Sequence, residues 1–315
     1  MKSLLVSEND AGQRLDRFLT KAFPALPAPL LYKAVRTKNV KVNRKRAAPD
    51  SRLQPGDAVD VYLPDDVLTP RPVRFDFTQA GKALDVVYED DNILLLNKPE
   101  GLLCHEDKQN ATDTLIQRVK RYLYEKGAYD PTAEQSFAPA LANRIDRNTG
   151  GLVIAAKNAE ALRVLNEKLK DRQIDKYYLC LVHGKVEPEE ALLTGYLTKN
   201  EEQNLVRVFT SPQPGGRTIR TQYRRMACRD GVSLLEVHLL TGRTHQIRAH
   251  LASVGYPLVG DGKYGKNAAD KKQGFKHQAL YSYKLAFHFT TPGGCLQYLN
   301  GRTFQIENVW FTQGF

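Results

Sequence analysis

A single aspartate stands between two arginines near the middle of the chain. Asp146 lies between Arg144 and Arg147, and a Thr-Gly-Gly turn at 149–151 then leads into an apolar stretch. Aspartate disfavours strands, so an acid at the start of an apolar strand is unusual. Flanking cations favour the ionised carboxylate, which can act as a nucleophile or as a charge partner. From these residues alone, a structural turn with both glycines at positive φ is the simpler interpretation.

Two later segments carry side chains that a cleft could use. The alternation of a strand expected over 174–184 places Tyr178 on the same face as the cysteine and valine that follow it. Arg243 precedes a helix that is expected to begin at the N-cap Thr244 and to stop at Gly255. It would therefore lie at a strand-to-helix corner, a place from which side chains reach clefts.

Other patterns argue against several kinds of site. The four cysteines are far apart and form no Cys-x-x-Cys pair, which argues against zinc and disulfides and favours reduced thiols in the cytoplasm. His245 and His250 are five residues apart on the expected helix, so they do not share a face as a metal pair would. A glycosidase needs a second catalytic carboxylate, and no motif supplies one near Asp146.

Composition indicates a basic protein with more than one domain. The 315 residues exceed the usual size of one domain, so we expect one large domain and at least one small one. The net charge of +11 and the pI of about 9.4 favour a polyanionic partner, with nucleic acid ahead of an anionic membrane surface. No apolar run approaches the length of a membrane span, and the first residues are not typical of a signal peptide.

Residues 1–64 are predicted to form a small module. Apolar spacing indicates helices over 12–23 and 29–37, followed by a short strand over 39–43 and a closing strand over 58–63. Between positions 33 and 46 there are seven lysines or arginines and no acid. Four of them lie on or beside the short strand and are expected to contact RNA: Lys41, Arg44, Lys45 and Arg46. The alternative is that this cluster is only a solvated face.

The rest of the chain is predicted to be a proline-containing linker, 65–84, and a large domain, 85–315. In the large domain, strands are expected near 85–96, 150–156, 174–184, 217–227, 232–240 and 277–287. Helices are expected over 114–126 and 159–169. Because helices interrupt the strands irregularly, the fold class is α+β with a mixed, largely antiparallel sheet and a central cleft.

Several motifs resemble known families. "RLDRFL", "VKVNRKR" and "LQPGDAVDVY" resemble the S4 RNA-binding domain over most of residues 10–63. "NKPEGL", "NRIDRNTGGLVIAAKN", "KYYLCLVHG", "LLTGRTHQIRAHLASVGYPLVGDGKYG" and "HQALYSYKLAF" follow in that order between residues 97 and 287. Together these five motifs resemble the RluA-type RNA pseudouridine synthases. Around the acid that family usually has His-Arg-Leu-Asp and then Thr-Ser-Gly, whereas this chain has Asn143, Ile145 and Gly150.

The resemblance implies a role for each candidate residue. Asp146 matches the family's essential aspartate, Arg243 the arginine that pairs with it, and Tyr178 the tyrosine that covers the uracil. Arg144 matches the arginine that helps to displace the target base. Each of these residues also has a structural interpretation, as charge neutraliser, core aromatic or cap.

The resemblance implies an isomerase that converts uridine to pseudouridine in RNA without metal or cofactor. The expected partner is ribosomal RNA of the large subunit, with transfer RNA as the second possibility, and the expected protein is a cytoplasmic monomer that binds no membrane. A non-catalytic RNA-binding or ribosome-assembly factor on the same fold is the main alternative. A basic nucleic-acid hydrolase is a third possibility.

Overall fold

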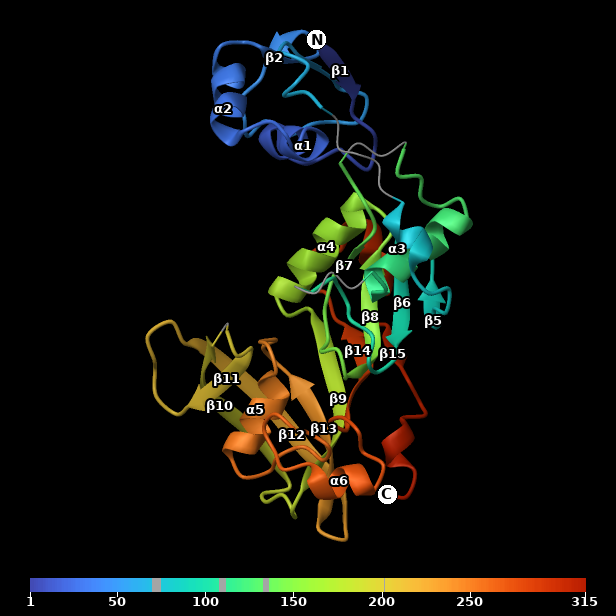
Figure 1. Ribbon diagram of the computed structural model, residues 1–315, viewed down its shortest axis with the longest axis vertical. Helices are drawn as coiled ribbons and strands as arrows, with labels where there is room; N and C mark the ends of the chain where they lie inside the picture. The colour runs from blue at the N-terminus through green and yellow to red at the C-terminus, as the bar shows by residue number, and fades with distance from the viewer. Residues whose placement is uncertain (70–74, 108–111, 133–135, 201) are drawn as a thin grey trace.

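The N-terminal module forms one end of an elongated molecule, and the larger domain forms the rest (Figure 1). The structure is a computed structural model that describes residues 1–69, 75–107, 112–132, 136–200 and 202–315. Among these residues, no helix is long and apolar enough to cross a membrane.

The N-terminal module packs two helices against a four-stranded sheet in the order β1-β4-β2-β3. Its elements are β1 (Lys2–Leu5), α1 (Leu15–Ala22), α2 (Ala28–Arg36), β2 (Val40–Val42), β3 (Lys45–Arg46) and β4 (Ala58–Val61). Both expected helices are present and slightly shorter than predicted, whereas β1 was not predicted. Phe18 and Val59 are fully buried in the shared core, as the apolar spacing indicated.

The basic stretch of this module forms a tight hairpin. Lys41 pairs with Arg46 across β2 and β3, and the turn between the strands contains Asn43 and Arg44 at φ 51° and 64°. Two consecutive left-handed residues match the right-handed twist of a two-residue hairpin. The turn therefore exposes Arg44 and the side chain of Lys45 to solvent.

The two ends of the predicted linker pack on different parts of the molecule. Leu68 is fully buried in the core of the N-terminal module. A 3-10 turn, η1 (Asp76–Gln79), buries Phe77 against Tyr124 at a ring-centroid separation of 5.5 Å. Pro70 and Pro72, which motivated the linker prediction, lie outside the described residues. The domain boundaries stay a prediction.

The large domain is built on one sheet that has eleven strands in the described residues. The main path runs β11-β10-β12-β13-β9-β14-β8-β6-β5, with β7 beside β8 and β15 beside β14. All pairings are antiparallel except that of β14 with β8. The predicted α+β class with a mixed, largely antiparallel sheet is therefore confirmed.

The strands are β5 (Val86–Glu89), β6 (Ile93–Lys98), β7 (Ala140–Leu141), β8 (Gly150–Ala156), β9 (Ile174–His183), β10 (Glu190–Asn200), β11 (Leu205–Phe209), β12 (Arg217–Arg229), β13 (Val232–Leu239), β14 (Leu280–Phe287) and β15 (Thr303–Gln305). The helices are α3 (Leu115–Glu125), α4 (Ala159–Lys170), α5 (Gln246–Ser253) and α6 (Ala268–Lys272). Short 3-10 turns η2 (Gly294–Leu299) and η3 (Trp310–Thr312) lie near the C-terminus.

The central strands are buried on both faces because helices cover each side. In β6, Ile93 and Leu95 pack in the core beneath α4, whereas Leu94 and Leu96 pack beneath α3. This double burial explains the continuous apolar run that the sequence shows at these positions. Thr114 and Asn158 cap the two helices, because each side-chain oxygen accepts a backbone N–H.

The start of α5 differs from the sequence prediction. Thr244 is not its N-cap; His245 occupies that position with left-handed φ of 51°, and the helix begins at Gln246. The Gln246 side chain organises the corner, because its Oε1 accepts the backbone N–H of Arg243 and the Thr241 hydroxyl. This amide fixes the turn before the helix, and among the described residues no side chain caps the helix N-terminus.

A few polar contacts join the N-terminal module to the large domain. The Arg163 guanidinium on α4 donates to the carbonyl of Ala11 at 2.5 Å. The Ser136 backbone N–H donates to Asp10 at 3.0 Å, and Gln13 Nε2 donates to the Ser136 hydroxyl at 2.6 Å. The module is therefore held beside α4.

Candidate active site

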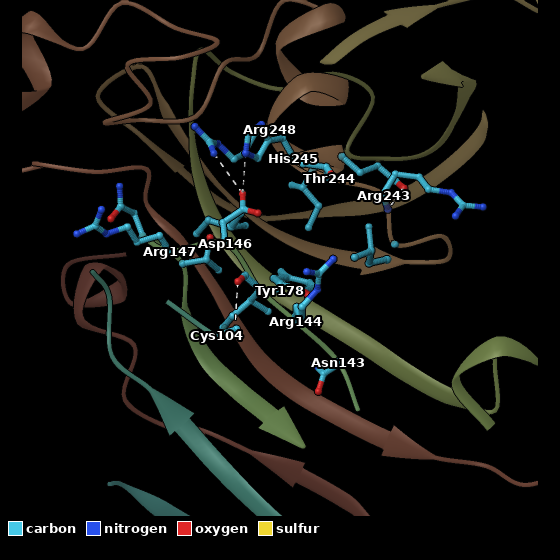
Figure 2. Close-up of a pocket in the computed structure, with 18 of the residues that line it drawn as sticks. Cys104, Asn143, Arg144, Asp146, Arg147, Tyr178, Arg243, Thr244, His245 and Arg248 are labelled. Carbon is cyan, nitrogen blue, oxygen red and sulfur yellow. Dashed lines mark hydrogen bonds and ion pairs between the residues drawn. The ribbon is translucent and has the colours of Figure 1, made fainter. Parts of the chain in front are cut away.

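A cleft of about 790 Å³ opens between the two halves of the large sheet. Its walls come from the segment 103–107, the loop 142–149 before β8, strand β9, the first turn of α5 and the loop at 263. All four residues expected to act in catalysis or base displacement line it: Arg144, Asp146, Tyr178 and Arg243. Figure 2 shows these side chains on their separate elements.

A buried lysine holds the loop that carries Asp146. Lys98 is fully buried at the end of β6, and its ammonium donates to the carbonyls of Pro99, Leu102 and Arg147 at 2.8, 2.8 and 2.9 Å. Burial lowers the pKa of Lys98 to about 8. Three carbonyl acceptors fix the ammonium, so the turn after Asp146 is tied to the turn after β6.

The two glycines after Asp146 are required for different reasons. Gly151 has φ of 111°, and a Cβ there would lie 2.2 Å from the backbone oxygen of Ser282. Gly150 does not have positive φ, contrary to the prediction, but a Cβ there would lie 2.4 Å from the Tyr281 ring. Tyr281 thus occupies the space that the family's usual serine would need at position 150.

Asp146 is held by an arginine from α5. Arg248 donates from Nη1 to Asp146 Oδ2 at 3.2 Å (Figure 2). The same guanidinium makes a bidentate pair with Asp261, from Nε at 2.7 Å and from Nη2 at 2.8 Å. Burial would lower the pKa of Arg248, but the hydrogen bonds and charge of Asp261 outweigh it and the pKa is raised. The guanidinium is therefore a permanent, fixed cation beside Asp146.

The expected pairing of Asp146 with Arg243 is wrong. Arg243 lies in the turn before α5, is exposed, and extends away from Asp146 in Figure 2. The correct arginine is five residues later, because α5 starts at Gln246 and directs its first turn at the loop of Asp146. One signal was available in the sequence: Arg248 stands in an apolar stretch and therefore needs a buried acid, which Asp261 supplies.

Tyr178 lies on the cleft side of β9, as predicted from the strand alternation. Its side chain is 5 % exposed and packs with Cys180 and Val182 in one core cluster. Burial raises the pKa of Tyr178, so its hydroxyl stays protonated near neutral pH. The ring therefore offers the cleft an apolar wall with a protonated hydroxyl.

A histidine and a second tyrosine complete the surroundings of Asp146, and the sequence reasoning did not assign them. His245 Nε2 lies 3.9 Å from Asp146 Oδ2, and its Nδ1 lies 2.8 Å from the Tyr264 hydroxyl. Burial lowers the pKa of His245, which keeps the ring neutral at neutral pH. The Arg248 guanidinium lies 5.3 Å from the centroid of the Tyr264 ring. Tyr264 thus contacts both His245 and Arg248, the two side chains next to Asp146.

Arg144 and Asn143 stand at the start of the same loop. Arg144 is exposed at the cleft. Asn143 accepts the Ile154 backbone N–H through Oδ1 at 2.8 Å, which continues the β7–β8 pairing by one side-chain bond. Among the described residues, Asn143 Nδ2 is the one buried side-chain polar atom without a hydrogen-bond partner.

The four basic residues expected to contact RNA lie together on the N-terminal module, away from the cleft. Lys41 is partly exposed, with its ammonium 5.4 Å from the centroid of the Tyr62 ring, whereas Arg44, Lys45 and Arg46 are exposed. Their strand β2 lies in the N-terminal module, whereas β9 and α5, which line the cleft, lie in the large domain (Figure 1). Among the described residues, no cluster of three or more metal-ligating side chains occurs.

Fold and site together define a class. An aspartate is held by a fixed arginine in a basic cleft beside a buried tyrosine, and a separate basic module stands at the end of the molecule. These features describe an enzyme that acts on a polyanion.

Comparisons with known proteins give the family. A model described as RNA pseudouridylate synthase matches residues 92–253, and the S4 domain model matches residues 13–59. A ribosomal large subunit pseudouridine synthase C of Haemophilus ducreyi is 32% identical over 90% of this chain and 86% of its own length. An uncharacterized RNA pseudouridine synthase of Mycoplasma capricolum is 31% identical over 99% of this chain and all of its own length. The chain belongs to the RNA pseudouridylate synthase family and carries an N-terminal S4 domain.

A solved structure has the same fold. Human RNA Pseudouridylate Synthase Domain Containing 4 aligns with a TM-score of 0.56 at 18% identity, covering 72% of this chain and 89% of its own. The resemblance to both families that the motifs implied is confirmed.

Proposed function

We propose that this protein isomerises specific uridines of large-subunit ribosomal RNA to pseudouridine, with Asp146 as the essential acid. The observation that carries the proposal is the Asp146–Arg248 pair at 3.2 Å in a basic cleft beside Tyr178. Relatives named ribosomal large subunit pseudouridine synthases support the choice of ribosomal over transfer RNA. The protein acts in the cytoplasm as a monomer, with residues 1–64 as RNA-binding domain, 65–84 as linker and 85–315 as catalytic domain.

The reaction breaks the N1–C1′ bond, turns the uracil, forms the C5–C1′ bond, and moves a proton from C5 to solvent while N1 gains one. Asp146 acts as an ionised carboxylate, either by attack on C1′ or by removal of a ribose proton. Arg248 keeps that carboxylate charged and oriented. Tyr178 covers the flipped uracil and stands next to the proton that leaves C5.

Two arginines have separate roles in this scheme. Arg144 enters the space that the flipped uridine leaves in the RNA, since it is exposed at the start of the Asp146 loop. Arg243 is exposed at the cleft mouth and contacts the RNA backbone there, rather than the acid. Lys41, Arg44, Lys45 and Arg46 hold the RNA from the N-terminal domain.

The decisive experiment is the Asp146→Asn variant. Tritium release from RNA labelled with 5-tritiated uridine measures isomerisation, and filter binding of the same RNA measures affinity. We expect activity to fall below detection while RNA affinity stays within about twofold, because the amide keeps the shape and loses the charge. Asp171→Asn, at the exposed end of α4, is the matched control and should retain activity.

Each alternative has its own outcome in this assay. A non-catalytic RNA-binding factor would release no tritium even as the wild-type protein. A nuclease or glycosidase would release RNA fragments or free base. Retained isomerase activity in Asp146→Asn would overturn the assignment of the acid.

A further inference from the structure

One lysine that lines the cleft makes no ion pair with any described residue. Lys176 lines the cleft from β9, two residues before Tyr178 and on the same face of the strand. Its side chain is half-buried and makes no ion pair or hydrogen bond with any described residue. The adjacent acid, Asp175, alternates to the other face of the strand and lies within ion-pair distance of His238 and His288. Partial desolvation of an ammonium without a partner is costly, and burial lowers the pKa of Lys176.

A second unsatisfied donor belongs to a residue that lines the cleft. Asn143 Nδ2 is buried without a partner, although Oδ1 of the same amide is fixed by the Ile154 N–H. That bond determines which end of the amide carries the donor. Figure 2 places Asn143 beyond Arg144, on the side away from Asp146. The donor is therefore separate from the groups that hold the acid.

The sheet brings the two residues into one neighbourhood. Lys176 pairs with Leu285 on β14, and Leu285 belongs to the same core cluster as Ile154, the residue that bonds Asn143. Ala142 and Leu169 pack against that cluster and also line the cleft. Lys176 and Asn143 therefore line the same cleft near one core cluster, and the exposed Arg144 lines it as well.

We propose that Lys176 and Asn143 form a binding site for one phosphodiester group of the RNA strand, next to the uracil position at Tyr178. This inference rests on the proposed function. A phosphodiester supplies the negative charge that Lys176 lacks and the acceptor oxygens that Asn143 lacks. Lys176 and Tyr178 are about 7 Å apart along the strand. A uracil at Tyr178 and a phosphodiester group next to it in the RNA can therefore reach the two side chains at once. Burial lowers the pKa of Lys176, and a bound anion would reverse that effect.

The flipped base is a poorer ligand for this site. Uracil is neutral and offers no charge to a shielded ammonium. Asn143 Nδ2 is buried in the free protein. A ligand must displace the atoms that cover it, so a charged phosphate oxygen is a better acceptor for it than a neutral uracil carbonyl.

The test uses the full-length protein and large-subunit ribosomal RNA from cells that lack the gene. Dissociation constants are measured across a salt series, together with KM and kcat for pseudouridine formation. Lys176→Met removes the charge and keeps the volume, and we expect about tenfold weaker binding. The slope of log affinity against log salt should fall by about 0.7 to 0.9, with kcat nearly unchanged. Lys176→Arg should retain most of the affinity.

Asn143→Asp is the second variant. It keeps the Oδ1 acceptor for Ile154 and replaces the free donor by a charged oxygen, so RNA affinity should fall about tenfold. Lys170→Met, an exposed lysine of α4 that does not line the cleft, is the matched control and should leave both slope and affinity unchanged.

The outcomes separate this inference from the proposed function. An unchanged salt slope in Lys176→Met, with an active wild-type protein, overturns the phosphate site. A fall in kcat without a change in slope also overturns it, because Lys176 would then act on the base. If the wild-type protein forms no pseudouridine, the proposed function fails, while the salt slope still tests the RNA contact.

Discussion

The arginine that contacts Asp146 is itself held by a more deeply buried acid, Asp261, and we call this arrangement the relay. Asp261 is 1 % exposed and accepts hydrogen bonds from Arg248 and from the backbone N–H groups of Lys263 and Tyr264. Burial would raise the pKa of Asp261, but Arg248 outweighs it and the pKa is lowered. Asp261 therefore stays charged, and one guanidinium contacts both acids. Such a fixed arrangement needs no reorganisation when charge develops at the reacting carbon.

Replacement of Arg248 tests this relay. Arg248→Gln should reduce kcat by about a hundredfold or more, because Asp146 loses its fixed cation. It should also destabilise the fold by about 3 kcal/mol, because Asp261 is left buried and unpaired. Pseudouridine formation and denaturant unfolding measure the two effects.

A double variant separates catalysis from folding in that test. Arg248→Gln with Asp261→Asn leaves no unpaired buried charge, so we expect stability to recover while kcat stays low. Arg243→Gln is the parallel variant at the cleft mouth, and it should raise KM and leave kcat within a few-fold. A larger loss of kcat in Arg243→Gln than in the double variant would contradict the relay.

Position 150 offers a packing test next to the acid. Gly150→Ser restores the residue of the family pattern, but its Cβ would meet the Tyr281 ring, whose hydroxyl donates to Asn97 at 2.6 Å. We expect a loss of about 1 to 3 kcal/mol in the free energy of unfolding. The second change Tyr281→Leu removes the ring and should recover part of that loss. Additive losses in the double variant would show that the two sites are not in contact.

The sequence was sufficient to place the acid and the tyrosine but not the arginine. Asp146 and Tyr178 line the cleft, and both were singled out through the family motifs, because the local pattern around Asp146 alone favoured a structural turn. The choice between Arg243 and Arg248 depends on where α5 begins, and a side-chain bond from Gln246 determines that. Position 150 has no room for a side chain because of Tyr281, a residue 131 positions away that no local pattern connects to it.

At the scale of elements, α5 is more deeply buried than its apolar spacing suggests. Residues 246–251 are all buried, including Arg248 and His250, whereas Val254, the C-cap, is 44 % exposed. The helix contacts both β11 and β12. Strands β10 and β11 supply part of that cover, and neither was predicted, because their exposed faces carry threonine, lysine and glutamate among the apolar residues. Apolar spacing predicts a helix with one buried face, and it fails for a helix whose polar residues are hydrogen-bonded in the protein interior.

Burial of His250 makes stability depend on pH. Its Nδ1 lies 2.9 Å from the Thr221 hydroxyl, and burial lowers its pKa from 6.5 to about 4. Between these values the unfolded chain binds more protons than the folded one, so stability falls as pH decreases from about 6.5 to about 4. The loss from this residue is about 3 kcal/mol.

The variant His250→Gln isolates this contribution. Glutamine keeps a polar group near Thr221 and does not titrate. The difference in unfolding free energy between wild type and variant, measured at pH 7 and pH 4, should change by about 3 kcal/mol in favour of the variant at low pH. A constant difference would mean that His250 is solvated in the folded state.

At the scale of the whole molecule, basic charge is divided between two surfaces. The hairpin of β2 and β3 presents its cations at one end of the molecule, and the cleft of the large domain presents others near Asp146. The polar contacts of Arg163, Asp10 and Gln13 hold the two modules together. A long RNA can therefore bind the end module while one nucleotide enters the cleft. Affinity and chemistry then have different determinants.

That division predicts the effect of neutralising the hairpin. Replacing Lys41, Arg44, Lys45 and Arg46 by glutamine together should weaken binding of ribosomal RNA and lower the slope of log affinity against log salt by about 3. At saturating RNA, kcat for pseudouridine formation should stay within about twofold, because the hairpin touches no reacting atom. Binding in a salt series and tritium release at high RNA concentration measure the two quantities.

The matched control removes the same charge elsewhere. Glutamine at Arg229, Lys271, Lys272 and Lys276, all exposed on the far part of the large domain, lowers the net charge equally. If only long-range attraction mattered, the slope of log affinity against log salt would fall equally in both quadruple variants, since net charge alone governs that attraction. A larger loss in the hairpin variant requires direct contacts with phosphates, because each contact releases its own counterions. Equal losses would remove the hairpin from the RNA interface and leave the cleft as the main binding surface.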